Sequence, residues 1–181
     1  INLFMDRRNF IQKATLAGSA AGIFPSFIYQ ESKPLEKVRM GFIGVGLRGR
    51  SHVQQALYRP DIEINAICDI DASAVDITLN MIKKAGKKAP AVYSKGDEDF
   101  LNLAKRDDLD GILIATPWQW HVPMALAVMN AGKYAAVEVS ATVTLQESWD
   151  LVNTFEKTGS HCMILENVCY RRDVMAVLKM V

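Results

Sequence analysis

Short apolar runs alternate along the chain with longer segments whose apolar residues recur at helical spacing. Val38 to Ile43 is a β-rich run that ends in glycines, and the apolar positions behind it continue with helical spacing up to Pro60. Further apolar runs, most of them followed by a helical segment, predict strands at 62–68, 91–93, 111–115, 134–139 and 163–165. This βαβ alternation predicts an α/β fold of the Rossmann type, with a doubly wound parallel sheet.

Residues with known preferences for helix ends mark several of the expected helices. Asp71 is suited to cap a helix after the second strand, and Pro123 suits the first turn of a later helix. Thr144 and Glu147 have the spacing of a capping box. The helix that they begin has one apolar stripe and ends before Gly159; the stripe consists of Leu145, Trp149, Val152 and Phe155.

The first thirty residues have the layout of a twin-arginine signal peptide. Arg7 and Arg8 are followed by Phe10 and then by an apolar, uncharged stretch from Ala14 to Ile28. An amphipathic amino-terminal helix is the alternative, but a stretch that is apolar on all faces would need complete burial. We expect residues 1–30 to be a signal for export to the periplasm through the twin-arginine translocase, which carries proteins already folded, and residues 31–37 to be a linker.

The pattern changes after Asn167, where a new helical segment starts at Arg171 and is interrupted by the chain end. We therefore expect residues 38–170 to form an NAD-binding Rossmann domain. Residues 171–181 are expected to be the start of a truncated substrate domain, most of which is missing from this chain.

Composition argues against nucleic-acid binding, a disulfide framework and a metal site. The 21 Lys and Arg residues balance 20 Asp and Glu residues, so no basic excess is available to neutralise a phosphate backbone, and nucleic acid is not an expected partner. The three cysteines are an odd number without zinc-ligand spacing. Neither a disulfide framework nor a metal site is expected.

The first predicted strand is followed by a glycine loop, Gly44-x-Gly46-x-x-Gly49, that opens a helix. In this context the pattern is typical of a dinucleotide site, because the glycines allow the backbone to approach a pyrophosphate at the helix N-terminus. Asp69 ends the second strand about 20 residues further on, where its carboxylate can accept both ribose hydroxyls and repel a ribose phosphate. The predicted cofactor is therefore NAD rather than NADP, although a capping role for Asp69 in the next helix remains open.

Other polar and aromatic residues follow later strands and should share the same edge of the sheet. Thr116 and Pro117 begin a segment at the end of the fourth strand, and Glu138 ends the fifth. For each of these residues, core packing, loop capping or solvent exposure is the alternative to a ligand role, and His52 and His161 are interpreted as structural or solvent-facing. The remaining candidates at this edge are Trp118, Gln119, Trp120, His121, Asn167 and Tyr170.

The chain resembles the glucose-fructose oxidoreductase and inositol dehydrogenase superfamily. The resemblance rests on residues 41–46, on residues 116–121, and on the segment from Ala131 to Glu138. Dehydrogenases of that superfamily carry Glu-Lys-Pro at the end of this strand, and the lysine serves in proton transfer. Here the triplet is Glu138-Val139-Ser140, and valine can neither donate nor accept a proton, which argues against the usual dehydrogenase chemistry.

This departure, together with residues 118–121 and 166–170, resembles glycoside hydrolase family 109, the NAD-dependent α-N-acetylgalactosaminidases. The resemblance implies that Tyr170 approaches the sugar, and Tyr170 and His121 are the candidate catalytic residues within this chain. It also implies a set of residues that line the NAD site beside the glycine loop: Leu47, Arg48, Asp69, Trp118, Gln119, Trp120, His121, Glu138, Val139 and Asn167.

The activity implied by the resemblance is release of terminal α-linked N-acetylgalactosamine by transient oxidation at C3, elimination, addition of water and return of the hydride. The expected partners are an N-acetylgalactosaminide substrate and the translocase, with a homo-oligomer left open, and the fragment alone is not expected to turn over substrate. A periplasmic sugar oxidoreductase of the same superfamily and a non-catalytic NAD-binding protein are the alternatives.

Overall fold

The computed structural model describes residues 37–180, so the predicted signal peptide and all but one residue of the predicted linker lie outside the described residues. The described chain forms a six-stranded sheet in the order β3-β2-β1-β4-β5-β6, and every neighbouring pair is parallel. The prediction of a doubly wound Rossmann-type sheet is confirmed. The strands are β1 (Val38–Ile43), β2 (Ile62–Cys68), β3 (Ala91–Tyr93), β4 (Gly111–Ile114), β5 (Tyr134–Val137) and β6 (Cys162–Ile164).

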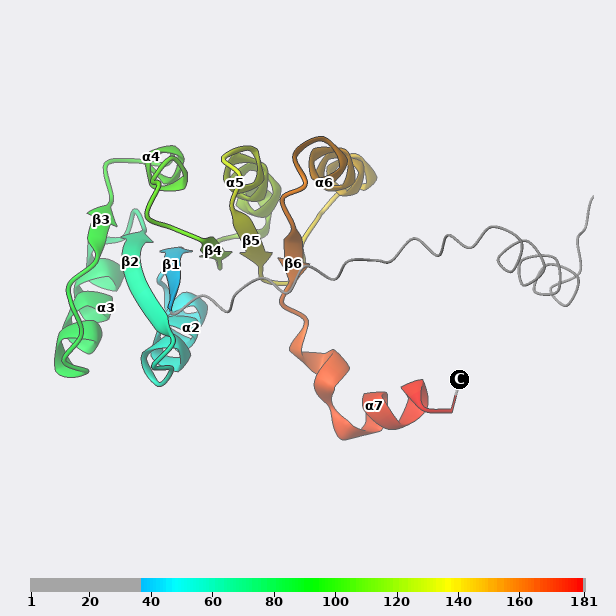
Figure 1. The fold of residues 1–181 in the computed structure, drawn as a ribbon, viewed down its shortest axis with the longest axis horizontal. Coiled ribbons are helices and arrows are strands. Elements are labelled where there is room, and N and C mark those ends of the chain that lie inside the picture. The colour runs from blue at the N-terminus through cyan, green and yellow to red at the C-terminus, as the bar shows by residue number, and fades with distance from the viewer. Residues whose placement is uncertain (1–36, 181) are drawn as a thin grey trace, which may run out of the picture. The chain divides into compact units, whose positions relative to one another are not determined.

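Helices cover both faces of the sheet. Helices α2 and α3 lie on one face below the β1–β3 half, whereas α4, α5 and α6 lie on the opposite face (Figure 1). The strand order reverses between β1 and β4, and open α/β sheets bind ligands at the carboxyl ends of the strands at such a point. The helices are α2 (Leu47–Leu57), α3 (Ala72–Lys84), α4 (Phe100–Ala104), α5 (Trp118–Asn130), α6 (Leu145–Thr158), the 3-10 helix η1 (Asn167–Tyr170) and α7 (Arg172–Leu178).

The sheet separates two apolar cores. Phe42 and Ile67 pack towards α2 and α3, while Ile112 and Ile114 pack towards α4 and α5. All four residues of β4 are buried, as the uninterrupted apolar run predicts for a central parallel strand. Burial of one such side chain contributes about 1.5–3 kcal/mol, so these two layers hold the strand ends in fixed positions.

Helix ends agree with the sequence at two places and differ at a third. The Asp71 carboxylate accepts a hydrogen bond from the N–H of Ser73 at the start of α3, and the capping box of Thr144 and Glu147 is formed. Helix α5, however, begins at Trp118, so Pro123 lies in its second turn and not in the first. The edges of β5 and β6 also differ by one or two residues from the expected runs.

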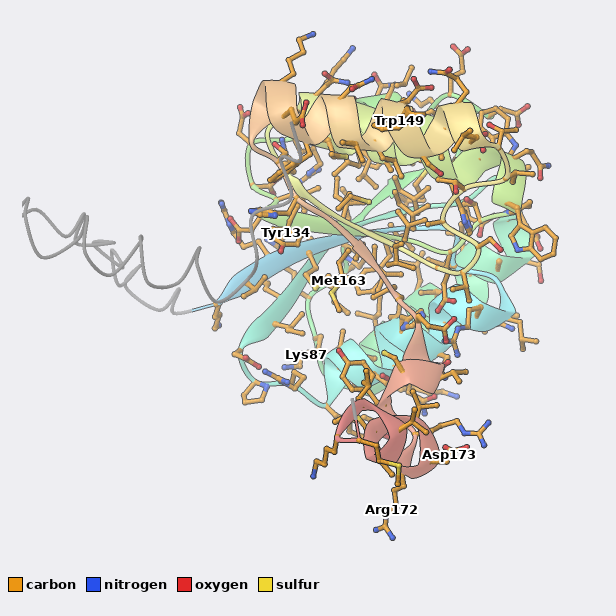
Figure 2. The ribbon with its side chains drawn as sticks, turned by 90° about the vertical axis from the view of Figure 1, so that its right-hand side faces the viewer. Lys87, Tyr134, Trp149, Met163, Arg172 and Asp173 are labelled. Atoms are coloured by element: carbon orange, nitrogen blue, oxygen red, sulfur yellow. The ribbon has the colours of Figure 1, made fainter. Side chains whose placement is uncertain are left out.

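Helix α6 forms as predicted, but its apolar stripe is largely exposed in the described chain. Trp149 is 55% exposed and Phe155 is 42% exposed. Figure 2 shows Trp149 on α6, on the opposite side of the sheet from Arg172 and Asp173 of α7. The predicted boundary at residue 170 falls between η1 and α7 but is not otherwise tested. Among residues 37–180, no helix is long and apolar enough to cross a membrane, and no group of acidic, His and Cys side chains could hold a metal ion.

Candidate functional site

The glycine loop lies between β1 and α2, at the carboxyl edge of the sheet. Gly44 has a φ of +81°, which favours glycine, and a Cβ there would lie 2.6 Å from the carbonyl oxygen of Ala115. A Cβ on Gly49 would lie 1.8 Å from the carbonyl oxygen of Gly44. These two glycines are therefore required by the packing of the loop, the helix and β4.

Gly46 differs from the other two glycines because a Cβ there would meet no atom of the described chain within 4 Å. It is the N-cap of α2, it makes no side-chain cap, and no acidic residue lies in the first turn of the helix. The first N–H groups of a helix lack intrahelical partners and attract anions. The open space and the uncapped helix end fit a pyrophosphate.

Asp69 joins the end of β2 to the glycine loop. Its Oδ2 accepts a hydrogen bond of 2.7 Å from the backbone N–H of Val45, and its Oδ1 accepts one of 3.0 Å from the N–H of Asp71. Capping of α3 belongs to Asp71, which favours a ligand role for Asp69 over the capping role that the sequence left open. A carboxylate has about four acceptor positions, so Asp69 retains capacity for ribose hydroxyls.

A cleft of about 230 Å³ runs along this edge between the loops that follow β1, β2, β3 and β4. It brings together four predicted elements of the site: Gly44 and Gly46 of the glycine loop, Asp69, the pair Thr116 and Pro117, and Trp120. It also includes residues that sequence reasoning missed, although they follow strands whose carboxyl ends share this edge. The missed residues include Ile70, Gly96, Asp97 and Met124.

The tryptophans of the 118–121 segment have different surroundings. Trp120 lines the cleft and packs edge-on against Phe100, with 6.1 Å between the ring centroids. Trp118 is 62% exposed, and Gln119 beside it is also exposed. Trp120 is thus the one member of this segment whose side chain the structure places in the cleft.

His121 is only 1% exposed, and both of its ring nitrogens face backbone oxygens. Nε2 lies 2.7 Å from the carbonyl oxygen of Thr116, and Nδ1 lies 2.7 Å from that of Ser140. The side chain links the loop after β4 to the loop after β5. This placement favours a structural role, and the predicted catalytic and NAD contacts of His121 stay predictions.

Glu138 is a buried carboxylate at the end of β5 and is 6% exposed. Its Oε1 accepts hydrogen bonds of 2.6 Å from Nε of Arg48 and 2.6 Å from Nε2 of His52, both on α2. Burial raises the pKa of Glu138, but the hydrogen bonds from His52 and Arg48 outweigh burial and lower the pKa overall. Glu138 is therefore held as an anion. His52, for which the sequence predicts a structural or solvent-facing role, has a specific partner in Glu138.

Arg48, His121 and Glu138 do not line the cleft, and the remaining predicted contacts also lie outside it. Leu47 is 86% exposed at the start of α2, and Val139 is 40% exposed after β5. Asn167 and Tyr170 are both exposed on η1, which follows β6. Their predicted contacts with NAD or sugar stay predictions.

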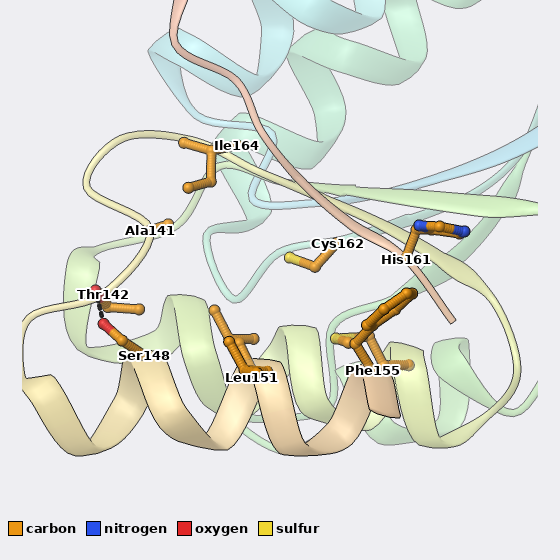
Figure 3. Close-up of a pocket in the computed structure, with 10 residues that line it drawn as sticks. Ala141, Thr142, Ser148, Leu151, Phe155, His161, Cys162 and Ile164 are labelled. Carbon is orange, nitrogen blue, oxygen red and sulfur yellow. Dashed lines mark hydrogen bonds between the residues drawn. The ribbon is translucent and has the colours of Figure 1, made fainter. Parts of the chain in front are cut away.

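A second hollow, of about 440 Å³, lies between α6, the end of α5 and β6 (Figure 3). It is larger than the cleft but contains no predicted site residue, and its lining is mainly apolar. Its polar groups include Thr142 and Ser148, whose hydroxyls are hydrogen-bonded to each other at 3.0 Å. We place the site at the smaller cleft, because the glycine loop, the helix N-terminus and the Asp69 carboxylate meet there.

Comparison with known proteins identifies the family and the fold of this chain. Residues 38–166 match the model of the oxidoreductase family with an NAD-binding Rossmann fold. A glycosyl hydrolase family 109 protein of Parabacteroides distasonis is 46% identical over 190 residues, which cover 97% of this chain and 41% of that protein. An alpha-N-acetylgalactosaminidase of Tannerella forsythia is 46% identical over 193 residues, with the same coverage. The chain therefore spans about 41% of the length of these relatives.

Solved structures share the fold at low sequence identity. Scyllo-inositol dehydrogenase from Lactobacillus casei superposes with a TM-score of 0.68 at 15% identity, over 81% of this chain and 41% of that one. GenD2 from gentamicin A biosynthesis, solved in complex with NAD, has a TM-score of 0.66 at 19% identity, over 82% of this chain and 40% of that one. The predicted resemblance and the predicted cofactor are thus confirmed: this chain belongs to the oxidoreductase family with an NAD-binding Rossmann fold, and its curated relatives include glycosyl hydrolase family 109 proteins.

Proposed function

We propose that the full-length protein is an NAD-dependent glycosidase that releases terminal α-linked N-acetylgalactosamine. The observation that carries the proposal is the end of β5, where Glu138 is followed by Val139 in place of the lysine that the resemblance assigns to dehydrogenases. The name of the Tannerella forsythia relative supports the choice of sugar. Because the chain spans about 41% of its relatives, the activity is proposed for the whole protein.

The residues of this chain bind and orient the cofactor in this proposal. The uncapped start of α2 holds the pyrophosphate beside Gly46, and Asp69 holds the ribose hydroxyls. When bound, NAD would supply a transient hydride acceptor for C3 of the sugar, so that the C2 proton becomes acidic, the glycosidic oxygen leaves by elimination, water adds at C1 and the hydride returns to C3 without net redox change.

We assign proton transfer in this scheme to other groups than Glu138. Glu138 is an anion with two hydrogen bonds to cationic or polar donors, which makes it a weak proton acceptor at neutral pH. Val139 carries no proton to exchange. Tyr170 is exposed on η1, and we propose that it approaches the sugar, as the resemblance implies.

Solvent deuterium tests this chemistry. The full-length protein is incubated in D2O with an aryl α-N-acetylgalactosaminide, and the released sugar is analysed by mass spectrometry and NMR. Elimination and re-addition predict one deuterium on carbon C2, since the abstracted proton exchanges with solvent. Direct displacement at C1 leaves every carbon-bound hydrogen in place, and that result would overturn the proposed mechanism.

A sugar oxidoreductase is the second candidate, and the family match of residues 38–166 favours it. It predicts an oxidised sugar and stoichiometric reduction of NAD, with no release of the aryl group. The two functions are separated by chromatographic analysis of the products from the same incubation.

We further propose that the protein is exported by the twin-arginine pathway. The support is the pair Arg7 and Arg8 before an apolar, uncharged stretch. This pathway transports folded proteins, so it suits a protein that must bind a cytoplasmic cofactor before it is exported. Replacing both arginines with lysine in the full-length protein should retain it in the cytoplasm in a fractionation experiment, whereas unchanged periplasmic recovery would contradict the proposal.

A further inference from the structure

His52 is a titratable side chain on α2 that the proposed chemistry leaves unused. It is 14% exposed, and its Nε2 lies 2.6 Å from Oε1 of Glu138, although the two residues are 86 positions apart in the sequence. It projects from α2, the helix whose N-terminus belongs to the dinucleotide site. A direct contact therefore joins that helix to the end of β5.

Arg48 and His52 are four residues apart on α2 and so lie on one face of the helix. Both donate to the same oxygen of Glu138. The Arg48 side chain is 48% exposed, whereas that of His52 is 14% exposed. The His52 contact is therefore better shielded from solvent than the Arg48 contact. Ion pairs of exposed side chains contribute little to stability, so the contact with His52 is expected to be the stronger of the two.

The remaining contacts of Glu138 fix its backbone. They leave its second carboxylate oxygen, Oε2, with one weak contact and with capacity to accept a further hydrogen bond. The backbone N–H donates to the carbonyl oxygen of Ile114, at 3.0 Å. Oε2 has only a 3.3 Å contact with the N–H of Val139. A carboxylate that is anchored through Oε1 can present Oε2 to a ligand hydroxyl in one orientation.

We propose that His52 is a positioning residue, which orients Glu138 at the carboxyl end of β5 and thereby sets the affinity of this site for NAD. The inference rests on the proposed NAD site and on the contact between Glu138 and NAD that the resemblance to family 109 implies. Loss of one hydrogen bond to a charged group corresponds to about a tenfold change in an equilibrium constant.

Two amide substitutions provide a matched test in the full-length protein. Glutamine places its amide nitrogen close to the position of the histidine Nε2, whereas asparagine is shorter by one methylene group. H52N should weaken NAD binding about tenfold by isothermal titration calorimetry, and H52Q should stay within about twofold of the wild type. Equal affinities for H52N and H52Q would overturn the proposal.

A double-mutant cycle shows whether His52 acts through Glu138. In an E138Q background, H52N should change NAD affinity by less than about twofold. If the two losses simply add, His52 acts independently of Glu138 and the proposal is wrong. H161N is the control, since His161 packs against Tyr134 and Phe155 at the opposite ends of the strands, and it should leave NAD affinity unchanged.

The outcomes remain informative if H52N does not fold. In that case the pKa of Glu138 is measured by carbon-13 NMR in the wild type and in H52L, whose side chain donates no hydrogen bond. The pKa should rise in H52L, because the hydrogen bond from His52 lowers the pKa of Glu138. An unchanged pKa overturns the proposal, and a wild-type protein that binds no NAD contradicts the use of this site for NAD instead.

Discussion

The carboxylate of Asp69 accepts a hydrogen bond of 2.7 Å from the backbone N–H of Val45, which fixes the end of β2 to the glycine loop after β1. The same carboxylate accepts a second hydrogen bond from the N–H of Asp71. Asp69 is thereby oriented before any ligand binds, and pre-orientation lowers the ordering cost of binding. The glycine loop and Asp69, which the sequence pattern places about 20 residues apart, are therefore in direct contact in the fold.

Replacement of Asp69 by asparagine should reduce discrimination between the two nicotinamide cofactors. The negative charge that repels a ribose phosphate is lost, so NAD should bind about tenfold more weakly while the preference over NADP shrinks. Calorimetric titration of both cofactors measures the ratio, and an unchanged ratio would contradict the assignment. Asp71→Asn is the control, because asparagine also caps helices well and the preference should stay as in the wild type.

Two glycine substitutions should separate binding from folding. Gly46→Ala should change the free energy of unfolding by less than about 0.5 kcal/mol, since its Cβ meets no chain atom, yet it should weaken NAD binding at least about tenfold. Gly49→Ala should destabilise the fold by about 1–3 kcal/mol or more, because its Cβ would collide with the Gly44 carbonyl. Denaturant unfolding measures the stability of each variant, and titration measures its NAD affinity. If the two variants lose the same stability, the assignment of Gly49 to packing and Gly46 to binding is wrong.

The stability that Glu138 contributes should depend on pH. Its pKa is lowered in the folded state, so the contribution is complete above the ordinary glutamate pKa of about 4.3 and is lost as the pH falls through the folded value. The wild type should therefore exceed E138Q in free energy of unfolding at pH 7, by about 1–3 kcal/mol, and the difference should shrink below about pH 4. A difference that is constant from pH 7 to pH 3 would contradict the ionised, hydrogen-bonded state.

The thiol of Cys68 should react slowly with alkylating reagents. Burial, followed by the nearby carboxylates of Asp99 and Asp69, raises the pKa of Cys68 to about 12, so very little thiolate exists at pH 8. The side chain is also only 5% exposed. Mass spectrometry of protein treated with iodoacetamide at pH 8 should find Cys68 modified far more slowly than in protein unfolded by denaturant. Similar rates in both states would show that the cleft is open around it.

The sheet and the glycine loop could be predicted from sequence because both depend on local patterns. Apolar runs define buried parallel strands, and Gly44 and Gly49 are required by turn geometry and close packing. The start of α5 could not be predicted from Pro123, since proline suits the first turn but is tolerated further in when tertiary contacts stabilise the helix. Trp120 packing on Phe100 is such a contact.

The contacts of Glu138 were harder to predict, because they join residues far apart in the chain. The position of Glu138 at the sheet edge follows from strand order, but the choice of Arg48 and His52 as partners depends on how α2 packs on the sheet. Their spacing of four residues on one helix was the available signal. Similarly, His121 follows the β4 strand as expected, yet its burial between two carbonyl oxygens depends on the loop after β5.

The central claim is that this edge holds NAD as a retained catalyst of glycoside cleavage. The most direct measurement follows aryl group release from an α-N-acetylgalactosaminide and absorbance at the NADH wavelength together, with the purified full-length protein and its bound nucleotide. Many aryl groups released per bound NAD, without accumulation of NADH, is the predicted result. Accumulation of one NADH per oxidised sugar would contradict the claim and identify the protein as an oxidoreductase.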